Sequence, residues 1–458
     1  MHRRRFLAAG RWQHPARATL TLALAAALTG GLIEAHAQTA ATPTVQDRPT
    51  LRAAFEAAWA RQPEAQALTA RRDAARAQQQ AARSLTPEPV EMELYTKTDR
   101  LNRNLGTREY EIGVAIPLWL PGERGRSQAL ADAEGRAIES RTTAAQLRVA
   151  ATVREGWWTW QRARVELDAA RGGLDHVGGD LVGQRVELHA ARGQLDNVRR
   201  IAADVGKRLK AGDLARADQH QADGAVAAAE AAVAQAEGSL TAAWQQLRPL
   251  VDMPGAAAPS HSPSADAEPE PSTAPSPADG LDTHAELLSL KDRSAVADGV
   301  AALAATQSRA SPELTIAATR DRGTYGESYQ QTFTVGVRIP FGAGPRHDAR
   351  VASARAEAVE LQAQMALERA RLAGEREAAR ARADAARAQL AATERRAQLA
   401  RESRGFFDKS FRLGESDLPT RLRIEAEAAD AERQAVRARI ELAAAISAWR
   451  QALGLLPQ

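Results

Sequence analysis

Two short stretches of the chain alternate apolar and polar side chains at every second position, as β-strands do. The segment "YEIGVAIP" begins at Tyr110, and the similar "FTVGVRIP" begins at Phe333. A second alternating segment precedes each of them across a polar loop, so the pattern predicts two β-hairpins, at about 88–117 and 312–340. The apolar positions of the predicted strands are Val90, Met92, Leu94, Tyr110, Ile112, Val114, Ile116, Leu314, Ile316, Phe333, Val335, Val337 and Ile339.

Long runs rich in Ala, Arg, Glu and Leu surround the hairpins, and their composition and periodicity predict long helices and coiled coils. Glycine-centred breaks near 206–218 and 410–421 interrupt these runs. The predicted helices cover about 49–84, 126–205, 213–251, 281–309 and 349–406, and a last one ends near 453.

The order helix, hairpin, helix, helix occurs twice, in residues 38–253 and 281–458, which predicts an internal duplication. Residues 254–280 between the two repeats are rich in Pro, Ala and Ser and predict a flexible linker. In the first repeat, "RVELDAARGGLDHV" (164–177) matches "RVELHAARGQLDNV" (185–198) at 11 of 14 positions. This local tandem duplication inserts 21 residues, or three heptads, and the glycines within it predict a kinked or bulged segment.

The first 37 residues have the pattern of a secretory signal peptide, with a basic start, an apolar stretch and an Ala35-His36-Ala37 cleavage site. The whole formal charge of +4 belongs to this leader, since 56 basic and 56 acidic residues remain after it is removed. Arg and Glu interleave along the predicted helices, so the sequence shows no basic surface for a nucleic acid. The chain contains no cysteine, which excludes disulfides, thiol chemistry and a lipid-modified N-terminal cysteine.

No pattern of residues suggests catalysis, a cofactor site or a metal site. The sequence has no Gly-rich phosphate loop or Ser/His/Asp set, and its histidines are scattered without the spacing of a zinc site. The aromatic run "WWTW" (157–160) is interpreted as packing between helices. We therefore predict a protein that is not an enzyme.

The alternating strands allow two interpretations: half-buried strands of a soluble sheet, or strands of a membrane barrel with one face toward lipid. The membrane interpretation is favoured because the chain has an export signal, the strands approach the ~9–11 residues that a tilted membrane strand needs, and the mature sequence contains no apolar run long enough for a spanning helix. Four strands cannot close a barrel, since about eight or more are required. Closure therefore requires several identical chains, and three would supply 12 strands.

The two glycine breaks carry candidate gating residues, which are Gly212, Asp213, Asp218, Gly414, Glu415, Asp417 and Arg421. Repeated around a ring of copies, the carboxylates would attract cations and repel one another, and Arg216 or Arg421 could hold the ring shut through pairs between chains. The alternative is that these acids cap the N-termini of the following helices, where they satisfy free backbone N–H groups. Both roles can coexist.

The chain resembles the outer-membrane efflux protein family, the TolC-like ducts of tripartite pumps and type I secretion. The resemblance is carried by "LRAAFEAAWARQPEAQALTARRDAARAQ", by the strand exits "GVAIPLW" and "GVRIPFG", and by "RLKAGDLARAD" and "FRLGESDLPTR". It implies a homotrimer with a 12-stranded β-barrel in outer-membrane lipid and a long periplasmic α-helical barrel that closes at a tip holding both glycine breaks. The opening helix and the Trp-rich composition look most similar to those of the heavy-metal cation branch of this family.

The resemblance also implies partners: a periplasmic adaptor and an inner-membrane transporter of the RND type. The predicted function is thus a passive, water-filled duct across the periplasm and the outer membrane. Two other interpretations stay open. A periplasmic coiled-coil adaptor would show one helical hairpin flanked by small soluble β-domains, and a structural coiled-coil protein would not explain the duplicated strand pairs.

Overall fold

The two predicted hairpins form one four-stranded antiparallel sheet in a computed structural model of the chain. The strands are β1 (Glu91–Thr98), β2 (Arg108–Pro117), β3 (Glu313–Arg322) and β4 (Gln330–Arg338), and they lie side by side in chain order. Strand β2 pairs with β3, so the sheet joins the two repeats. The structure describes residues 50–102, 104–171, 194–251, 267–271, 279–342 and 344–458; the predicted leader and the centre of the tandem duplication lie outside these ranges.

Helices make up most of the rest of the described chain. The first predicted helix is divided in two, because Pro63 starts a new helix where its missing N–H costs no hydrogen bond. Within the described ranges, no helix is both long enough and apolar enough to cross a membrane. The helices are α1 (Leu51–Ala60), α2 (Pro63–Ala82), α3 (Glu123–Arg171), α4 (Gln194–Ala211), α5 (Arg216–Val251), α6 (Asp279–Asp282), α7 (Ala285–Thr306), α8 (Pro345–Arg412) and α9 (Leu418–Ala452).

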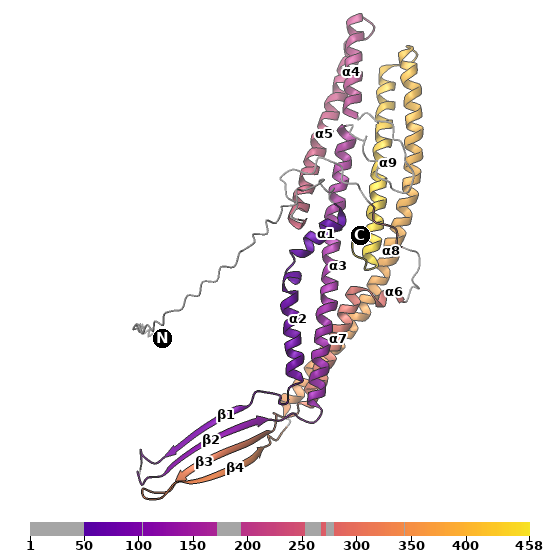
Figure 1. Cartoon of the computed structure of the whole chain (residues 1–458). Coiled ribbons are helices and arrows are strands. Elements are labelled where there is room, and N and C mark those ends of the chain that lie inside the picture. Colours follow the sequence, from indigo (N-terminus) through magenta and orange to yellow (C-terminus); the bar gives the residue numbers. More distant parts are fainter. Residues whose placement is uncertain (1–49, 103, 172–193, 252–266, 272–278, 343) are drawn as a thin grey trace, which may run out of the picture. The chain divides into compact units, whose positions relative to one another are not determined.

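The long helices pack side by side in a fixed order (Figure 1). Next to the sheet, α3 packs between α2 and α7, and α7 packs on α8. Farther from the sheet, α3 packs between α5 and α9, and α9 packs on α8. Helix α8 therefore forms one edge of this arrangement along its whole length, and α2 and α5 form the other edge.

The main hydrophobic core lies where α1, α3, α5 and α9 meet. Trp157 and Trp160 are almost fully buried there, with their rings in an edge-to-face arrangement 5.2 Å apart. Trp244 of α5 packs on Trp160 at 5.6 Å. These contacts confirm the prediction that "WWTW" packs between helices.

The structure differs from the flexible-linker prediction at residues 267–271, which dock against the helices. Glu268 is only 3% exposed, and its carboxylate accepts hydrogen bonds from Arg154 of α3 at 2.6 and 3.0 Å. The same carboxylate lies 3.3 Å from the guanidinium of Arg450 and accepts a hydrogen bond from the hydroxyl of Ser447, both on α9. Two buried guanidinium groups need a counter-ion, and the linker supplies it. We call residues 267–271 the strap.

Candidate functional site

The apolar face of the sheet is continuous across all four strands. One row of register partners is Met92, Val114, Ile316 and Val335, and the next row is Leu94, Ile112, Ala318 and Phe333. Ile116, Leu314 and Val337 form a third row, Tyr110 extends the face at the far end, and Val90 and Ile339 lie one residue outside the strands. The predicted residues that lie within the strands therefore do share one apolar face.

The opposite face of the sheet carries polar and small side chains. Glu91 and Glu93 of β1 lie in register with Ala115 and Gly113 of β2, and Tyr95 lies in register with Glu111. Lys97 pairs with Glu109 at 3.2 Å, again across β1 and β2. The alternation in sequence is thus converted into one aliphatic face and one hydrophilic face.

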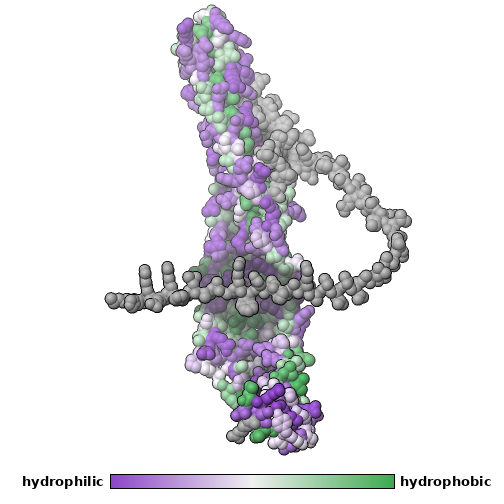
Figure 2. Space-filling model, turned by 90° about the vertical axis from the view of Figure 1, so that its left-hand side faces the viewer, coloured by the Kyte–Doolittle hydropathy of each residue, from purple (hydrophilic) through white to green (hydrophobic). Residues whose placement is uncertain are grey.

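Most of the large apolar side chains on this face are exposed, with Ile116 and Leu314 partly exposed, whereas a sheet in a soluble protein buries its apolar face against another layer. Phe333 is 73% exposed, Val335 70% and Met92 67%. The buried positions of β2 are instead Gly113, Ala115 and, at the end of the strand, Pro117. Figure 2 shows the hydrophobic surface that results at the sheet end of the chain. Exposed apolar patches of this kind mark contact with a membrane or a partner.

Aromatic and arginine side chains gather at the end of the sheet away from the helices. The Arg320 and Arg322 guanidinium groups lie 4.7 and 5.0 Å from the ring of Tyr329. Tyr329 also packs near Tyr110, with 6.3 Å between ring centroids. Tyrosine at the edge of an apolar band is typical of a membrane interface, where one end of the ring is apolar and the other is hydrated.

The second candidate region lies at the opposite end of the helices, where two turns reverse the chain. Gly212 has φ +88° and Gly414 has φ +77°, a left-handed conformation that glycine adopts without strain. The N–H of Asp213 donates to the carbonyl of Arg208 at 2.9 Å, and the N–H of Glu415 donates to that of Ser410 at 3.0 Å. Both turns therefore have the same glycine C-cap, and the predicted breaks are confirmed.

The acids of the two turns divide into two kinds. The Asp218 carboxylate accepts a hydrogen bond from the Ala215 N–H at 2.9 Å, and Asp417 accepts one from the Thr420 N–H at 3.1 Å. The bonds from Thr420 lower the pKa of Asp417. These two acids are helix caps, as the capping interpretation predicts. Asp213 and Glu415 are exposed at the turns themselves.

Arg421 makes several contacts within its own chain, and the suggested pairs between chains stay a prediction. Its guanidinium lies 2.9 Å from Asp408 of α8 and 3.9 Å from Asp204 of α4. It also stacks on the ring of Phe411, which is 3% exposed, with Arg208 on the same ring. The reason is that the first turn of α9 packs against α4, so Arg421 links the two helical hairpins of one chain.

A polar groove of about 650 Å³ runs between α4 and the α8–α9 hairpin beside these contacts. Arginines line it together with Asp204, Asp408 and Glu425. Burial raises the pKa of Glu425, although the neighbouring Arg404 and Arg421 favour its charged form. The groove is therefore a network of ion pairs between the two hairpins.

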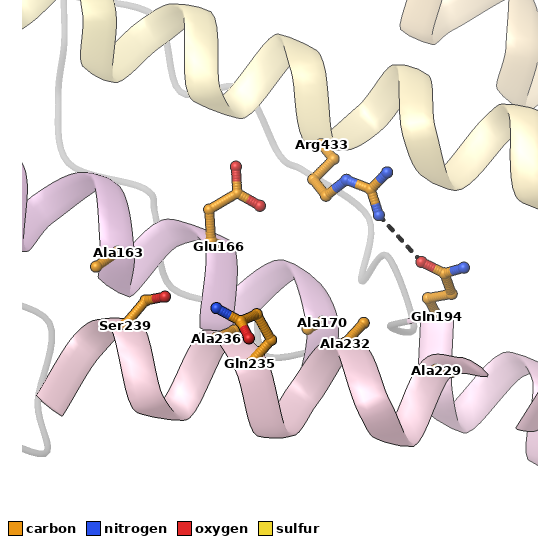
Figure 3. Close-up of a pocket in the computed structure, with 10 residues that line it drawn as sticks. All are labelled: Ala163, Glu166, Ala170, Gln194, Ala229, Ala232, Gln235, Ala236, Ser239 and Arg433. Atoms are coloured by element: carbon orange, nitrogen blue, oxygen red, sulfur yellow. Dashed lines mark hydrogen bonds between the residues drawn. The ribbon is translucent and has the colours of Figure 1, made fainter. Parts of the chain in front are cut away.

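A smaller hollow of about 320 Å³ lies between α3 and α5 (Figure 3). Five of its ten lining residues are alanines, and the others are Glu166, Gln194, Gln235, Ser239 and Arg433. At the rim, Arg433 of α9 donates to the Gln194 side chain of α4 at 3.1 Å. The alanines leave a gap between the helices here. Among the described residues, no cluster of His, Asp and Glu side chains is placed to hold a metal ion.

Comparisons with known proteins establish the fold. No protein-family model matches the chain, and no curated protein matches its sequence. Solved structures do match. One is CusC, in a study of its folding and transmembrane channel formation, with a TM-score of 0.66 at 17% sequence identity; the match covers 88% of this chain and 92% of the CusC chain. The outer membrane protein VceC of Vibrio cholerae matches with a TM-score of 0.64 at 16% sequence identity, and the match covers 88% of this chain and 96% of VceC. The MtrE outer membrane channel of Neisseria gonorrhoeae, in its open state, matches with a TM-score of 0.65 at 14% sequence identity, and the match covers 89% of each chain.

The described chain thus has the fold of outer-membrane channels. The predicted fold class, a mainly helical chain built from a duplicated helix–hairpin–helix–helix unit with a small antiparallel sheet, is confirmed.

Proposed function

We propose that several copies of this chain form a passive channel across the outer membrane and the periplasm, as the outer component of a tripartite efflux or export system. The observation that carries the proposal is the sheet, which exposes an unbroken aliphatic face over four strands and has β1 and β4 as its edges. In lipid this face is stable, because hydrocarbon replaces the missing protein layer.

The sheet edges argue for several copies. An open sheet edge in hydrocarbon leaves unpaired backbone groups, so β1 of one copy needs β4 of another. Three copies would give 12 strands, within the range of membrane barrels, which begins at about eight. The polar face, including Glu91, Glu93 and Glu111, would then line a water-filled lumen. A homotrimer is also what the family resemblance implies.

The helices supply the periplasmic part of the proposed duct. At about 1.5 Å per residue, the 68 residues of α8 span roughly 100 Å. Energy and selectivity would come from partners, namely an inner-membrane transporter of the RND type and a periplasmic adaptor, and the channel itself would be non-catalytic. A heavy-metal cation is the substrate class that the sequence resemblance suggests.

Conductance tests the proposal. The purified protein, added to a planar lipid bilayer, is expected to insert and produce discrete ionic current steps, and the native protein should sediment with the outer membrane. A monodisperse monomer that stays in solution without detergent and produces no current would exclude a channel.

We further propose that the tip acids narrow the channel, since copies of Asp213 and Glu415 would face one another around a ring. Changing Asp213 and Asp218 together to Asn is expected to raise single-channel conductance and weaken the preference for cations. Asn caps helices about as well as Asp, so the start of α5 is kept. Glu377→Gln in the middle of α8 is the control. Unchanged conductance and cation preference in the double variant would exclude a role of these two acids in narrowing the channel and leave Asp218 as a helix cap only.

A further inference from the structure

The two edge helices of the chain, α5 and α8, each expose a stripe that points away from their own neighbours. We infer that these stripes pack on each other between adjacent copies, with the large side chains of α8 inserted between the small side chains of α5. This interface rests on the proposed channel and specifies which surfaces close it. The partner is a second copy of this chain.

The stripe on α8 is made of Leu399, Phe406 and Leu413, the last being the residue that caps the helix. These residues recur every seven positions and are 65%, 68% and 75% exposed. Ala397 and Phe411, two positions before Leu399 and Leu413, are buried. Two positions on an α-helix correspond to about 200°, so the stripe lies on the side opposite the packed face. Three large apolar side chains in one line on a polar helix indicate a missing partner.

The stripe on α5 is made of small residues in the same period. Gly224, Ala231 and Gly238 are exposed. Each of them lies two positions after a buried alanine of the packed face, and these alanines are at 222, 229 and 236. A Cβ atom built on Gly224 or Gly238 would meet nothing within 4 Å. Ala227 and Ala228 lie between the first two members and are exposed as well. Residues 224, 227, 228 and 231 thus have the spacing of a coiled-coil hole that receives one side chain of a facing helix.

The two stripes lie at the same height along the helix axes, measured from the turns that end the helices. Arg421, three residues inside α9, contacts Asp204, which lies seven residues inside the end of α4. Glu425, seven residues inside α9, contacts Asn197, which lies fourteen residues inside the end of α4. The α4–α5 turn therefore projects about four to seven residues beyond the α8–α9 turn, or roughly 6–10 Å.

This offset pairs Phe406 with the hole at 224–231. Phe406 lies six residues before the end of α8, and Ala228 lies twelve residues after the start of α5, a difference of six. Copies related by rotation about an axis along the helices keep their levels, so Phe406 of one copy meets this hole in the next. Leu399, one heptad along α8, then meets the hole at 231–238. The helices run in opposite directions along this interface.

The contact is heterologous, with a different surface used by each partner, and repeated contacts of this type close into a ring when the rotation permits. It continues the proposed pairing of the sheet edges: β4 leads into α8, and β1 follows α2, so the same two edges meet along the helices and the sheet.

Disulfide cross-linking tests the interface, and the absence of cysteine from the chain makes every introduced thiol unique. Two differently tagged full-length chains, one Phe406→Cys and one Ala228→Cys, are expressed together, purified in detergent and oxidised. The expected product is a disulfide-linked heterodimer in at least half of the mixed assemblies, because the two Cα atoms would lie within disulfide reach. The matched control replaces Ala228→Cys by Ala242→Cys, an exposed residue at the same heptad position of α5 but two heptads, or about 21 Å, away, and it should give at least tenfold less product.

The outcomes separate the interface from the channel. A conducting oligomer in which Phe406→Cys reacts freely with a bulky maleimide and forms no link to position 228 would overturn the α5–α8 interface and leave the channel intact. Equal linkage to positions 228 and 242 would overturn the level of the contact. A monomeric, non-conducting protein would overturn the proposed function itself.

Discussion

Replacing Glu268 by alanine is expected to lower the free energy of unfolding by about 3–5 kcal/mol, the usual cost of leaving a buried charge without its partner. The variant keeps Arg154 and Arg450, each 4% exposed, facing each other across α3 and α9 without a counter-ion. Tryptophan fluorescence during urea unfolding of the detergent-solubilised protein measures the change, because Trp157 lies one helical turn from Arg154 in the main core.

A matched control lies two residues further along the strap. Glu270 pairs with Arg387 of α8 at 2.6 Å, but both side chains are about half exposed. Glu270→Ala is therefore expected to cost only about 0.2–1 kcal/mol. If Glu268→Ala does not fold, the free energy of unfolding is measured instead on Glu268→Gln and on a triple variant with Arg154→Met, Glu268→Leu and Arg450→Met. The triple variant should recover most of the lost stability, since apolar groups can replace a buried ion network. Equal, small losses for Glu268→Ala and Glu270→Ala would contradict a structural role of the buried carboxylate.

The strap shows that the composition of a segment does not predict the contacts of its individual residues. A segment dominated by Pro, Ala and Ser has too little apolar surface to form a core, and that average correctly suggests a linker. The average cannot show that one carboxylate, between Ala267 and Pro269, is the counter-ion of two arginines on helices far away in sequence. The available signal was an arginine at a core position, because Arg154 lies on the buried face of α3, between Val153 and Trp157.

The strands show the opposite case, in which local pattern carried most of the information. Alternation at every second position placed Val114 and Val335 on one face and Gly113 and Thr334 on the other, and the register agrees. The pairing of β2 with β3 could not be found in the same way, because these strands are about 200 residues apart and nothing local specifies a distant neighbour.

The tip shows both situations in one place. Gly212 and Gly414 were found because a left-handed C-cap has a strong residue preference. The partners of Arg421 depend on how α9 packs against α4, which no spacing in the sequence encodes. The exposed stripes on α5 and α8 became interpretable only once the order of the helices was known.

Changing Val335 to arginine is expected to destabilise the membrane-inserted protein by about 2–4 kcal/mol, the cost of placing this cation on the lipid side of a barrel strand near the bilayer centre. Val335 lies in the middle of β4, is 70% exposed and lies in register with Ile316 and, beyond it, with Val114 and Met92. The yield of detergent-extracted oligomer from the outer membrane and the midpoint of urea unfolding in lipid vesicles measure the effect.

Thr334→Arg supplies the control, because the neighbouring residue points to the polar face, where it lies in register with Ala317 of β3, Gly113 of β2 and Glu93 of β1. An arginine there would enter a water-filled lumen beside a carboxylate, so stability should change little while anion passage increases. The two variants place the same charge one residue apart on one strand. If both are tolerated equally, or if Thr334→Arg is the more damaging, the aliphatic face does not contact lipid and the sheet is not a membrane sheet. A large difference in the expected direction means that one side of β4 lies in an apolar environment and the other in water, and a shift of the unfolding midpoint in lipid vesicles assigns that environment to the bilayer.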